Sequence, residues 1–409
     1  MKIAIIGAGA AGMAAAITAA ASGQNEILLF ERQARVGRKL LATGNGRCNL
    51  SNRQTHPGHY HGAFPEFVRP ALDAFPVESV LDFFHTLGLY TITEDSGRIY
   101  PYSDQANSVV DVLRFALERK NVRLFTSTEI SGVKKTPEGF HLKDGSGNSW
   151  DADRLIVTCG GAAGTKLGGG LSGYQLLRSL GHHCTKLYPS LVQLKTDPAL
   201  VRGLKGIRAN AALKLTVREA LLAVASGEVQ FTEYGVSGPA VFEISRAAAM
   251  AEDAVLHLDL LPGYRAEDLL SALCIRISRF PALKAGDLLT GILHNRLGRM
   301  LVSACGIGQD TPMTTLNWKQ LTQIVQLCHE WSLPITGNMG MDGAQVTAGG
   351  IVTMEFDPDT LQSRIVPGLY AAGEVLDVDG DCGGFNLQWA WSSGLLAGQL
   401  KESNYVNHS

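Results

Sequence analysis

Three glycines near the start of the chain have the spacing of a loop that binds a diphosphate. Gly7, Gly9 and Gly12 follow the β-rich run 2–6 and precede an alanine-rich helical stretch that reaches about Ser22. The first glycine permits a tight turn, the second lets phosphates approach the backbone, and the third lets the helix pack closely on the strand. Free N–H groups at the helix N-terminus then face the negative charge of the phosphates.

An acidic residue follows at the distance that ribose recognition requires. Glu31 ends the β-rich run 26–30 and stands 19 positions after Gly12. Its carboxylate can accept hydrogen bonds from both hydroxyls of an adenosine ribose, and its charge repels a 2′-phosphate. Strand, glycine loop, helix and acid together predict a site for the ADP-ribose part of FAD or NAD and disfavour NADP. They do not separate FAD from NAD.

Two further segments favour FAD. Segment 37–52 is dense in glycine, basic groups and short amides, a composition suited to backbone that lies against a planar ring and a diphosphate. Far downstream, 368–374 reads as a strand and tight turn, and 383–388 opens a helix expected to reach about Leu400. An acid near the ribityl hydroxyls and a helix N-terminus aimed at the flavin O2/N1 edge would stabilise negative charge on a reduced flavin.

These segments supply most of the predicted cofactor-binding residues. They are Gly7, Gly9, Ala10, Ala11, Gly12, Glu31, Arg32, Arg38, Lys39, Thr43, Gly44, Asn45, Gly46, Arg47, Cys48, Asn49, Gly373, Glu374, Asp377, Asn386, Leu387 and Gln388.

Four blocks resemble the signature of one bacterial flavoprotein family: TGNGRCN at 43–49, FTEYGVSGP at 231–239, TAGG at 347–350, and 373–388, which ends in GGFNLQ. The family includes the BaiN-like (bile-acid reductase) and aminoacetone oxidase-like FAD-dependent oxidoreductases, and the resemblance covers residues 1 to about 398. It implies one FAD per chain and no metal. It also implies that the turn with Thr158, Gly160 and Gly161 lies near the FAD pyrophosphate and that the backbone near Ile130 faces adenine.

The expected fold class is α/β: a Rossmann-like two-dinucleotide-fold FAD domain with an inserted β-barrel and a small helical domain. The FAD domain comprises residues 1–187 and a return segment, 349–409. The β-barrel substrate domain comprises 188–262 and 332–348, and the helical domain 263–331. Helices are expected over 77–88 and 108–119, and strands over 121–125, 155–158, 212–218, 228–231 and 255–260.

Composition narrows the class of protein. The 409 residues are 45% hydrophobic and 18% charged, so large cores can form, and a net charge of −2 disfavours nucleic acid as a partner. No run of about 20 apolar residues predicts a membrane span. The seven cysteines contain no C-x-x-C pair, which fits free thiols in a reducing cytoplasm and gives no support to a dithiol beside the flavin.

Several side chains could act in catalysis, but a non-catalytic role is favoured for each. Cys48 is expected to pack against the flavin ring, and Cys382 is read in the same way. His56, His59 and His61 are expected to be solvated loop residues without a matching acidic ligand, and no metal site is assigned.

Four further pairs of residues are treated alike, and no catalytic acid or base is assigned. The side chains of His182 and His183 are expected to point to opposite sides. Trp389 and Trp391 are expected in the core, and Asp379 and Asp381 in ribityl or loop contacts. Glu233 and Tyr234 are expected at the border of a substrate cavity between domains.

The sequence therefore predicts an FAD-dependent oxidoreductase that exchanges a hydride between a small organic substrate and flavin. NAD(P)H or O2 recycles the flavin, and any nicotinamide visits transiently because no second complete G-x-G-x-x-G unit appears. Reduction of an activated C=C bond and oxidation of a small amine both remain open. The alternatives are an FAD-containing tRNA-modifying enzyme and a non-catalytic flavin-binding protein. Oligomeric state is not predicted.

Overall fold

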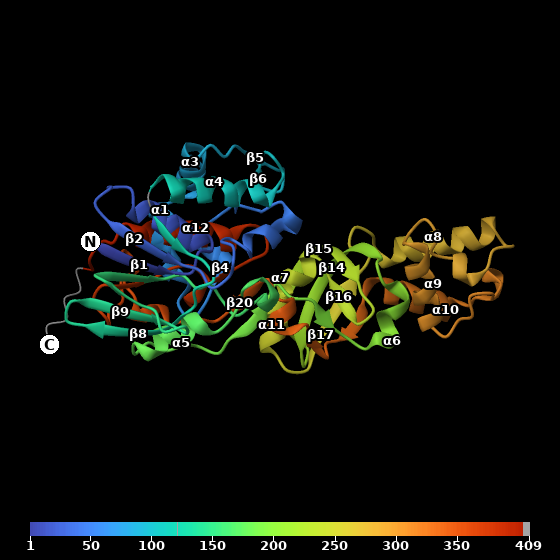
Figure 1. The fold of residues 1–409 in the computed structure, drawn as a ribbon. Coiled ribbons are helices and arrows are strands. Elements are labelled where there is room, and N and C mark those ends of the chain that lie inside the picture. Colours follow the sequence, from blue (N-terminus) through green and yellow to red (C-terminus); the bar gives the residue numbers. More distant parts are fainter. Residues whose placement is uncertain (121, 404–409) are drawn as a thin grey trace. The chain divides into compact units, whose positions relative to one another are not determined.

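The structure is a computed structural model that describes residues 1–120 and 122–403. The chain folds into two compact units (Figure 1). One unit is formed by Met1–Tyr188 with Gln345–Ser409, and the other by Pro189–Ala344. The first unit therefore contains both predicted glycine turns, although they lie far apart in the sequence.

The first unit is built on a parallel sheet of five strands in the order β21-β11-β1-β2-β7. These strands are β1 (Lys2–Ile6), β2 (Glu26–Phe30), β7 (Arg123–Phe125), β11 (Arg154–Val157) and β21 (Leu369–Ala371), and all their pairings are parallel. The apolar runs of β1, β2 and β11 are buried, as strands covered on both faces require. The strands expected over 2–6, 26–30 and 155–158 are thus confirmed. Position 121 of the expected strand 121–125 lies outside the described residues.

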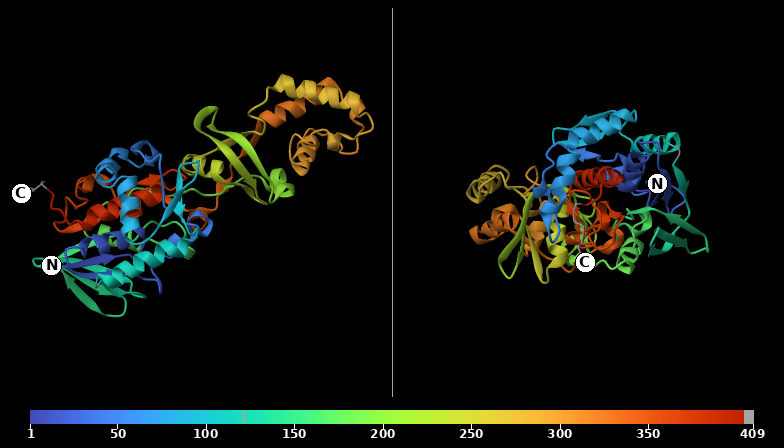
Figure 2. Two further views of the ribbon diagram at one scale, coloured as in Figure 1. Left: turned by 90° about the horizontal axis from the view of Figure 1, so that it is seen from above. Right: turned by 90° about the vertical axis from the view of Figure 1, so that its left-hand side faces the viewer.

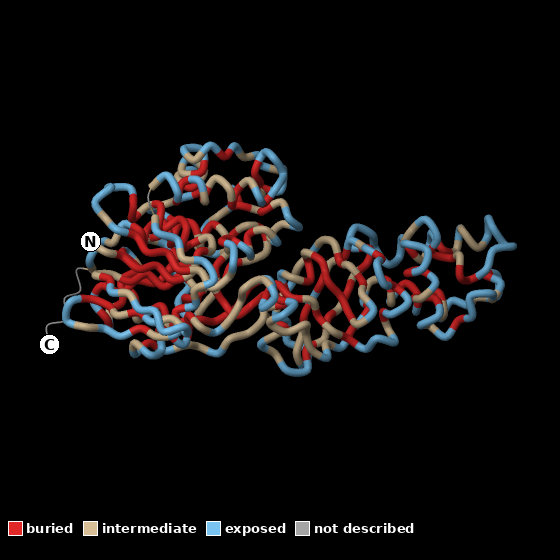
Figure 3. Tube along the Cα trace, in the orientation of Figure 1, coloured by how far each residue is buried: buried red, intermediate tan, exposed pale blue. Residues whose placement is uncertain are grey.

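Helices cover one face of this sheet and a small antiparallel sheet covers the other (Figures 1 and 2). The helices are α1 (Ala10–Ala19), α4 (Ala106–Arg119) and α12 (Phe385–Gly398). The antiparallel sheet consists of β8 (Ile130–Thr136), β9 (Gly139–Asp144) and β10 (Ser149–Ala152). Figure 3 shows the central strands and α12 as the most continuously buried part of the unit.

Helix α12, from the C-terminal part of the chain, packs directly on α1. A Cβ atom added at Gly394 would lie 2.5 Å from the carbonyl oxygen of Ala11, and one at Gly398 would lie 2.6 Å from that of Ala15. The two backbones can approach this closely only because glycine has no side chain. Trp389 and Trp391 on the same helix are buried, which confirms their expected place in the core.

Smaller elements complete the first unit. They are α2 (Arg69–Ala74), α3 (Val77–Thr86), α5 (Ser172–Ser179), β3 (Ser51–Asn52), β4 (Tyr60–His61), β5 (Thr91–Thr93), β6 (Arg98–Pro101) and β22 (Asp379–Gly380). The helices expected over 77–88 and 108–119 are confirmed as α3 and α4, with ends shifted by two residues. Strand β4 pairs with β22, so the segment around residue 60 lies beside the segment around residue 380.

The second unit contains the antiparallel strands expected of the insertion. Its seven-stranded sheet has the order β18-β17-β14-β15-β16-β13-β19. The strands are β13 (Leu194–Lys195), β14 (Arg208–Val217), β15 (Ala220–Phe231), β16 (Gly235–Ser237), β17 (Ala254–Asp259), β18 (Trp331–Pro334) and β19 (Gly337–Asn338). The strands expected at 212–218, 228–231 and 255–260 fall on β14, β15 and β17.

Helices of the second unit share their core with this sheet. The longer ones are α7 (Pro239–Met250), α8 (Ala266–Arg279), α9 (Asn295–Ala304) and α10 (Trp318–His329). One buried apolar cluster joins strand residues such as Leu256 and Phe231 to helix residues such as Leu301 and Ile324. No helix within the described residues is long and apolar enough to cross a membrane.

Candidate dinucleotide-binding site

Two of the three N-terminal glycines are required by contacts inside the protein. Gly7 has a φ of +103°, and a Cβ atom there would lie 2.5 Å from the carbonyl oxygen of Thr158. A Cβ atom at Gly12 would lie 1.8 Å from the oxygen of Gly7 and 2.6 Å from Oγ1 of Thr158. The Thr158 hydroxyl donates to Gly7 O at 2.9 Å. These contacts hold the turn after β1 against the end of β11 and the first turn of α1.

Gly9 differs because it faces open space. No atom lies within 4 Å of a Cβ atom added there, and no side chain caps the first turn of α1. The amide groups of this turn, which include those of Ala10 and Ala11, have the charge and direction that a pyrophosphate requires. The loop thus fits the diphosphate of a dinucleotide. The open space beside Gly9 and the first-turn amides of α1 is called the diphosphate cradle, and a side chain at Gly9 would occupy it.

Glu31 lies beside this cradle, at the end of β2. Its Oε2 accepts a hydrogen bond from the Ala8 amide at 2.9 Å, and its Oε1 accepts one from the Gln33 amide at 2.8 Å. Each carboxylate oxygen keeps a second lone pair, which a ribose hydroxyl can use. The two amides hold the carboxylate in place before any ligand binds.

The other predicted residues of this end make contacts with the protein. The Arg32 guanidinium donates to the carbonyls of Gly168 and Gly169 at 2.5 and 3.0 Å. Arg38 donates to the side chain of Gln33 at 2.7 Å. Ile130 is buried at the start of β8. Their role in cofactor binding stays a prediction.

Residues from both halves of the first unit meet at Glu374. Lys39 Nζ lies 2.8 Å from Glu374 Oε2, and the Thr347 amide donates to Oε1 at 2.8 Å. A Cβ atom at Gly161 would lie 2.5 Å from the same oxygen, whereas Gly160 faces open space. The structure therefore brings Lys39, Gly161 and Glu374 together. Thr347 was not predicted as a site residue, and the only signal for it was its place in the block 347–350.

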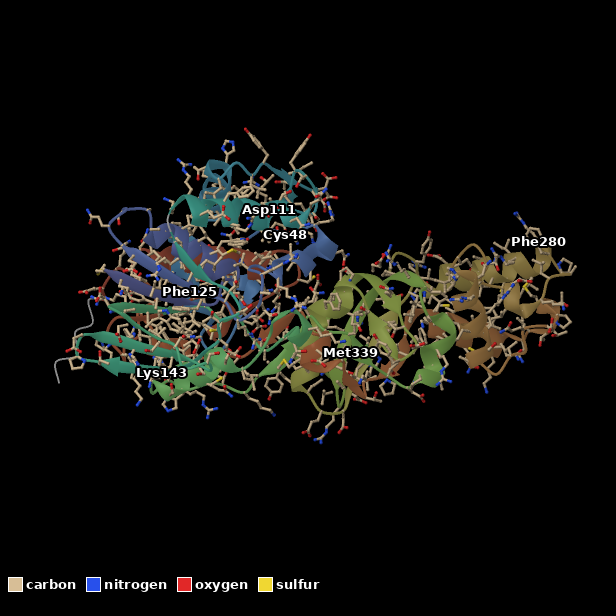
Figure 4. All side chains as sticks on the ribbon, viewed as in Figure 1. Cys48, Asp111, Phe125, Lys143, Phe280 and Met339 are labelled. Carbon is tan, nitrogen blue, oxygen red and sulfur yellow. The ribbon has the colours of Figure 1, made fainter. Side chains whose placement is uncertain are left out.

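The loop that contains Cys48 is held in unusual backbone conformations. Gly44, Asn45, Gly46 and Cys48 all have φ values between +56° and +85°. The Cys48 side chain is buried, and burial raises the pKa of its thiol to about 12. The thiol is protonated at neutral pH, which agrees with the expected packing role rather than a catalytic thiolate. Figure 4 labels Cys48 among the side chains of the first unit.

Arg47 lies among acidic side chains. Its Nε donates to Asp104 at 2.5 Å, another nitrogen donates to Glu94 at 2.9 Å, and the guanidinium lies 3.9 Å from the centre of the Tyr100 ring. The hydrogen bonds with Asp104 and Glu94 raise the pKa of the Arg47 guanidinium above its ordinary value. These contacts engage the guanidinium within the protein, so its predicted role at the cofactor stays a prediction.

Asn49 carries a buried acceptor that fits a flavin ring. Its Oδ1 has no hydrogen-bond partner within the described part of the chain. It lies 2.9 Å from the position of a Cβ atom added at Gly384, and so faces the glycine turn that precedes α12. A buried acceptor without a donor is costly. A ring N–H group of bound flavin would satisfy it, which makes Asn49 part of the fit to this cofactor.

The turn before α12 is shaped by glycine and fixed by amide side chains. Gly383 and Gly384 have φ values of +143° and +105°. Asn386 exchanges two hydrogen bonds with the backbone of Gly380, and Gln388 is buried and bonds to Ser51 at 2.6 Å. No side chain caps the start of α12. Asn386 and Gln388 therefore position the turn, and the amides of the first turn, near Leu387, remain for the predicted flavin edge.

Asp377 comes two residues before β22. Its side chain is buried, and the Ala63 amide donates to its Oδ2 at 3.1 Å. Its predicted contact with the ribityl chain stays a prediction.

The expectation that the three loop histidines lack an acidic partner is wrong for His59 and His61. His59 Nδ1 lies 2.9 Å from Asp381 Oδ2, and His61 Nε2 lies 2.7 Å from Asp381 Oδ1. His59 also stacks on Phe385, the first residue of α12, at 4.1 Å. Burial alone would raise the pKa of Asp381, but hydrogen bonds from His61 and His59 outweigh it, so the pKa is lowered. The partner carboxylate lies over 300 positions away, so sequence proximity did not show it.

The expectation for His182 and His183 is also wrong. Both rings contact one carboxylate, because Glu355 Oε2 lies 2.9 Å from His182 Nδ1 and Oε1 lies 2.6 Å from His183 Nδ1. The histidines follow the end of α5 in irregular backbone, where alternation between two sides does not apply. Nε2 of the buried His182 ring bonds to Ser363 Oγ at 3.0 Å. These contacts tie the segment 182–183 to the segment 355–363 of the first unit.

Glu233 and Tyr234 make contacts inside the second unit. Glu233 forms an ion pair with Lys205 at 3.0 Å, and the Tyr234 hydroxyl bonds to the Gln193 side chain. Their place at a substrate cavity stays a prediction.

The diphosphate cradle, Glu31 and the glycine turn before α12 define the class of protein. It is an FAD-binding flavoprotein with a Rossmann-type fold, and an oxidoreductase. The chain belongs to the HI0933-like family, because the model of the HI0933-like protein Rossmann domain matches residues 1–400.

Two curated relatives align over nearly the whole chain. A 3-dehydro-bile acid delta(4,6)-reductase of Clostridium scindens is 41% identical over 403 residues, which covers 97% of this chain and 98% of that protein. A ribosomal RNA dihydrouridine synthase of Escherichia coli is 32% identical over 397 residues, with 97% and 96% covered. Among solved structures, a flavocytochrome c3 fumarate reductase has a TM-score of 0.45 at 14% identity, with 98% of this chain and 78% of that chain covered.

Proposed function

We propose that the protein reduces a carbon–carbon double bond conjugated to a carbonyl in a small organic substrate. A hydride is exchanged between substrate and FAD, with NAD(P)H as the electron donor and O2 as the alternative redox partner. The observation that carries this proposal is the bond type shared by two relatives. A delta(4,6)-reductase acts on double bonds, and dihydrouridine is uridine with the double bond next to its ring carbonyl reduced. Oxidation of a small amine has no such support.

The residues of the chain would bind and orient the cofactor, while bound FAD supplies the redox chemistry. The cradle at Gly9 and the carboxylate of Glu31 fit the ADP-ribose half. Asn49 and the start of α12 fit the ring, where the positive end of the helix stabilises negative charge. Glu31 favours a ribose without a 2′-phosphate at this site, which agrees with FAD.

Reduction of a double bond also consumes a proton, and one group beside α12 is suited to hold it. His59 and His61 each use one ring nitrogen on Asp381, which leaves Nε2 of His59 and Nδ1 of His61 for exchange with solvent or substrate. Both rings are partly exposed, so protons can be replenished from water. An imidazole nitrogen can act as a hydrogen-bond donor or acceptor, so it can pass a proton to a neighbouring group. We therefore assign proton handling to this group.

The test is an anaerobic experiment on the FAD-loaded protein. NADH and NADPH are offered separately, and loss of the yellow flavin absorbance is followed. The reduced protein is then mixed with a 3-oxo-4,6-diene steroid or with cyclohexenone. We expect the absorbance to return and the product to gain the mass of two hydrogens. The proposal is overturned if neither nicotinamide nor either enone changes the flavin while a small amine bleaches it.

Ribosomal RNA is a second candidate substrate. Relatives named ribosomal RNA dihydrouridine synthase come from two organisms, Escherichia coli and Haemophilus influenzae, at 32% and 31% identity. A net charge of −2 disfavours nucleic acid binding only as a whole-chain average. Unmodified ribosomal RNA is the probe: dihydrouridine in its nucleoside digest, with no turnover of the enones, would assign the protein to RNA.

A further inference from the structure

Tyr100 places a phenol beside the loop that is predicted to lie against the flavin ring. It belongs to β6, which pairs with β3, and β3 follows the loop 43–49 in the chain. A Cβ atom added at Gly44 would lie 3.2 Å from Cε1 of Tyr100 and 3.5 Å from Cβ of Asn49. Cε1 is bonded to the carbon that carries the hydroxyl. The hydroxyl end of the ring is therefore next to Asn49, whose buried Oδ1 fits the flavin.

The Tyr100 ring is held firmly, yet its hydroxyl has no partner inside the protein. The residue is only 6% exposed, and the guanidinium of Arg47 lies 3.9 Å from the centre of the ring. In the described part of the chain the hydroxyl makes no hydrogen bond, and it is not one of the fully enclosed polar atoms without a partner. A molecule from outside the protein can therefore reach it.

Neighbouring hydroxyl groups of the same segment are already used. The Thr43 hydroxyl donates to a backbone carbonyl at 2.7 Å, and the Ser51 hydroxyl donates to the side chain of Gln388 at 2.6 Å. The guanidinium of Arg47 donates to two acidic side chains. Of these three hydroxyl groups, only that of Tyr100 keeps its proton for a ligand.

The environment of Tyr100 keeps the phenol in its donor form. Burial raises the pKa of the Tyr100 phenol, and the negative charge of Glu94 adds to this effect. The hydroxyl is therefore protonated at neutral pH. A ketone oxygen only accepts hydrogen bonds, so a protonated phenol is complementary to it.

Reduction of an enone makes such a donor useful, because negative charge develops on the carbonyl oxygen. When a hydride adds to the β-carbon, the electron pair of the C=C π bond forms a new π bond between the α-carbon and the carbonyl carbon. The π pair of the C=O bond becomes a lone pair on oxygen. The α-carbon then takes a proton and the C=O bond re-forms. A fixed donor at the oxygen stabilises the charge as it develops.

We propose that Tyr100 is a catalytic residue whose hydroxyl donates a hydrogen bond to the carbonyl oxygen of the substrate. The catalytic part of this assignment rests on the proposed function. The hydrogen bond itself can be tested by binding of a ketone that cannot be reduced in this way.

The first test compares Tyr100→Phe with the unaltered FAD-loaded protein. The reduced proteins are mixed anaerobically with cyclohexenone, and the return of flavin absorbance is timed. We expect the rate to fall about 100-fold, as is usual when one donor to a developing oxyanion is removed. FAD affinity and the rate of reoxidation by O2 should stay unchanged, because neither depends on a carbonyl oxygen.

The second test is equilibrium binding of cyclohexanone to the oxidised protein, followed by the change in flavin absorbance. The dissociation constant should rise about tenfold in Tyr100→Phe, since one hydrogen bond is lost. Tyr102→Phe is the matched control in both tests, because Tyr102 follows the same strand but is 73% exposed. It should behave like the unaltered protein.

The outcomes separate this assignment from the proposed reaction. If cyclohexanone binds through Tyr100 but cyclohexenone is not reduced, the proposed reaction fails and the carbonyl contact stands. Equal reoxidation rates and equal ketone binding in Tyr100→Phe and the unaltered protein would overturn the contact. Absence of ketone binding by the unaltered protein would overturn it as well. Loss of FAD or slower reoxidation by O2 in Tyr100→Phe would show a structural role instead.

Discussion

At the residue scale, similar glycines have different tasks. Gly12 is surrounded by backbone, with Gly7 O only 1.8 Å from an added Cβ atom, whereas Gly9 meets no protein atom within 4 Å. Gly12 is therefore required for the fold, and Gly9 leaves space for something that the chain does not itself supply. Asn49 resembles Gly9 in this respect, because its buried Oδ1 has no hydrogen-bond donor among the described residues.

This difference predicts opposite outcomes for two alanine substitutions. Gly9→Ala should leave the thermal stability of the FAD-free protein within about 1 kcal/mol but weaken FAD binding at least tenfold, because the methyl group occupies the diphosphate cradle. Gly12→Ala should destabilise the FAD-free protein by about 3 kcal/mol or more, because backbone must move. Thermal unfolding and flavin fluorescence titration measure both. Equal destabilisation by the two substitutions would contradict the assignment of the open space at Gly9 to the diphosphate.

The shared carboxylate of His59 and His61 predicts a pH-dependent stability. Because the pKa of Asp381 is lowered in the folded protein, its contribution is present above the ordinary carboxyl pKa of about 4 and is lost as pH falls through the lower folded value. Asp381→Asn should therefore lower the free energy of unfolding at pH 7, by about 1 kcal/mol at a partly exposed site, and by less in acid.

Urea unfolding at several pH values measures this difference. Asp151→Asn is the matched control, because Asp151 also pairs with a histidine, His141 at 2.7 Å, but is far more exposed. Its effect should be near zero. A deficit in Asp381→Asn that grows toward acid would contradict the assigned charge state.

At the element scale, the contact between α1 and α12 holds the two halves of the site in one unit. Gly394 and Gly398 lie against the backbone of α1, and α12 begins at the second glycine turn. The helix whose first amides are proposed to face the flavin ring is thus fixed by the helix whose first amides are proposed to face the diphosphate. Separation of these helices would disturb both ends of the site.

Gly394→Ala should therefore destabilise the protein by about 2 kcal/mol and weaken FAD binding, since its Cβ would lie 2.5 Å from Ala11 O. Gly132→Ala is the control, because a Cβ atom there meets no atom within 4 Å. Thermal unfolding with and without FAD measures both. If Gly394→Ala binds FAD and unfolds like the control, the coupling of the helices is refuted.

At the scale of the whole molecule, the chain has two units with separate cores. The predicted cofactor residues all lie in the first unit, and the second unit has its own apolar cluster of sheet and helix residues. A ligand stabilises the part of a protein that it binds.

Differential scanning calorimetry should therefore show a transition that FAD moves and one that it leaves in place. At FAD concentrations about 100 times its dissociation constant, the first unit gains about 2.7 kcal/mol. Removal of FAD should reverse this shift and leave the second transition unaltered. A single transition that moves as a whole would show instead that the units unfold together.

Sequence alone determined the elements whose signals are local. Gly7, Gly9, Gly12 and Glu31 predicted strand, turn, helix and ribose acid, because each depends on neighbours within about thirty positions and on backbone freedom that glycine alone supplies. Buried parallel strands and amphipathic helices such as α3 and α4 were predictable for the same reason, with ends uncertain by about two residues.

Only the tertiary structure decided the pairings between distant segments. It placed Asp381 between His59 and His61, Glu355 between His182 and His183, and Glu94 and Asp104 on Arg47. A side chain's partner depends on which segments the packed sheet brings side by side, and that choice is made by the burial of the whole core rather than by local spacing.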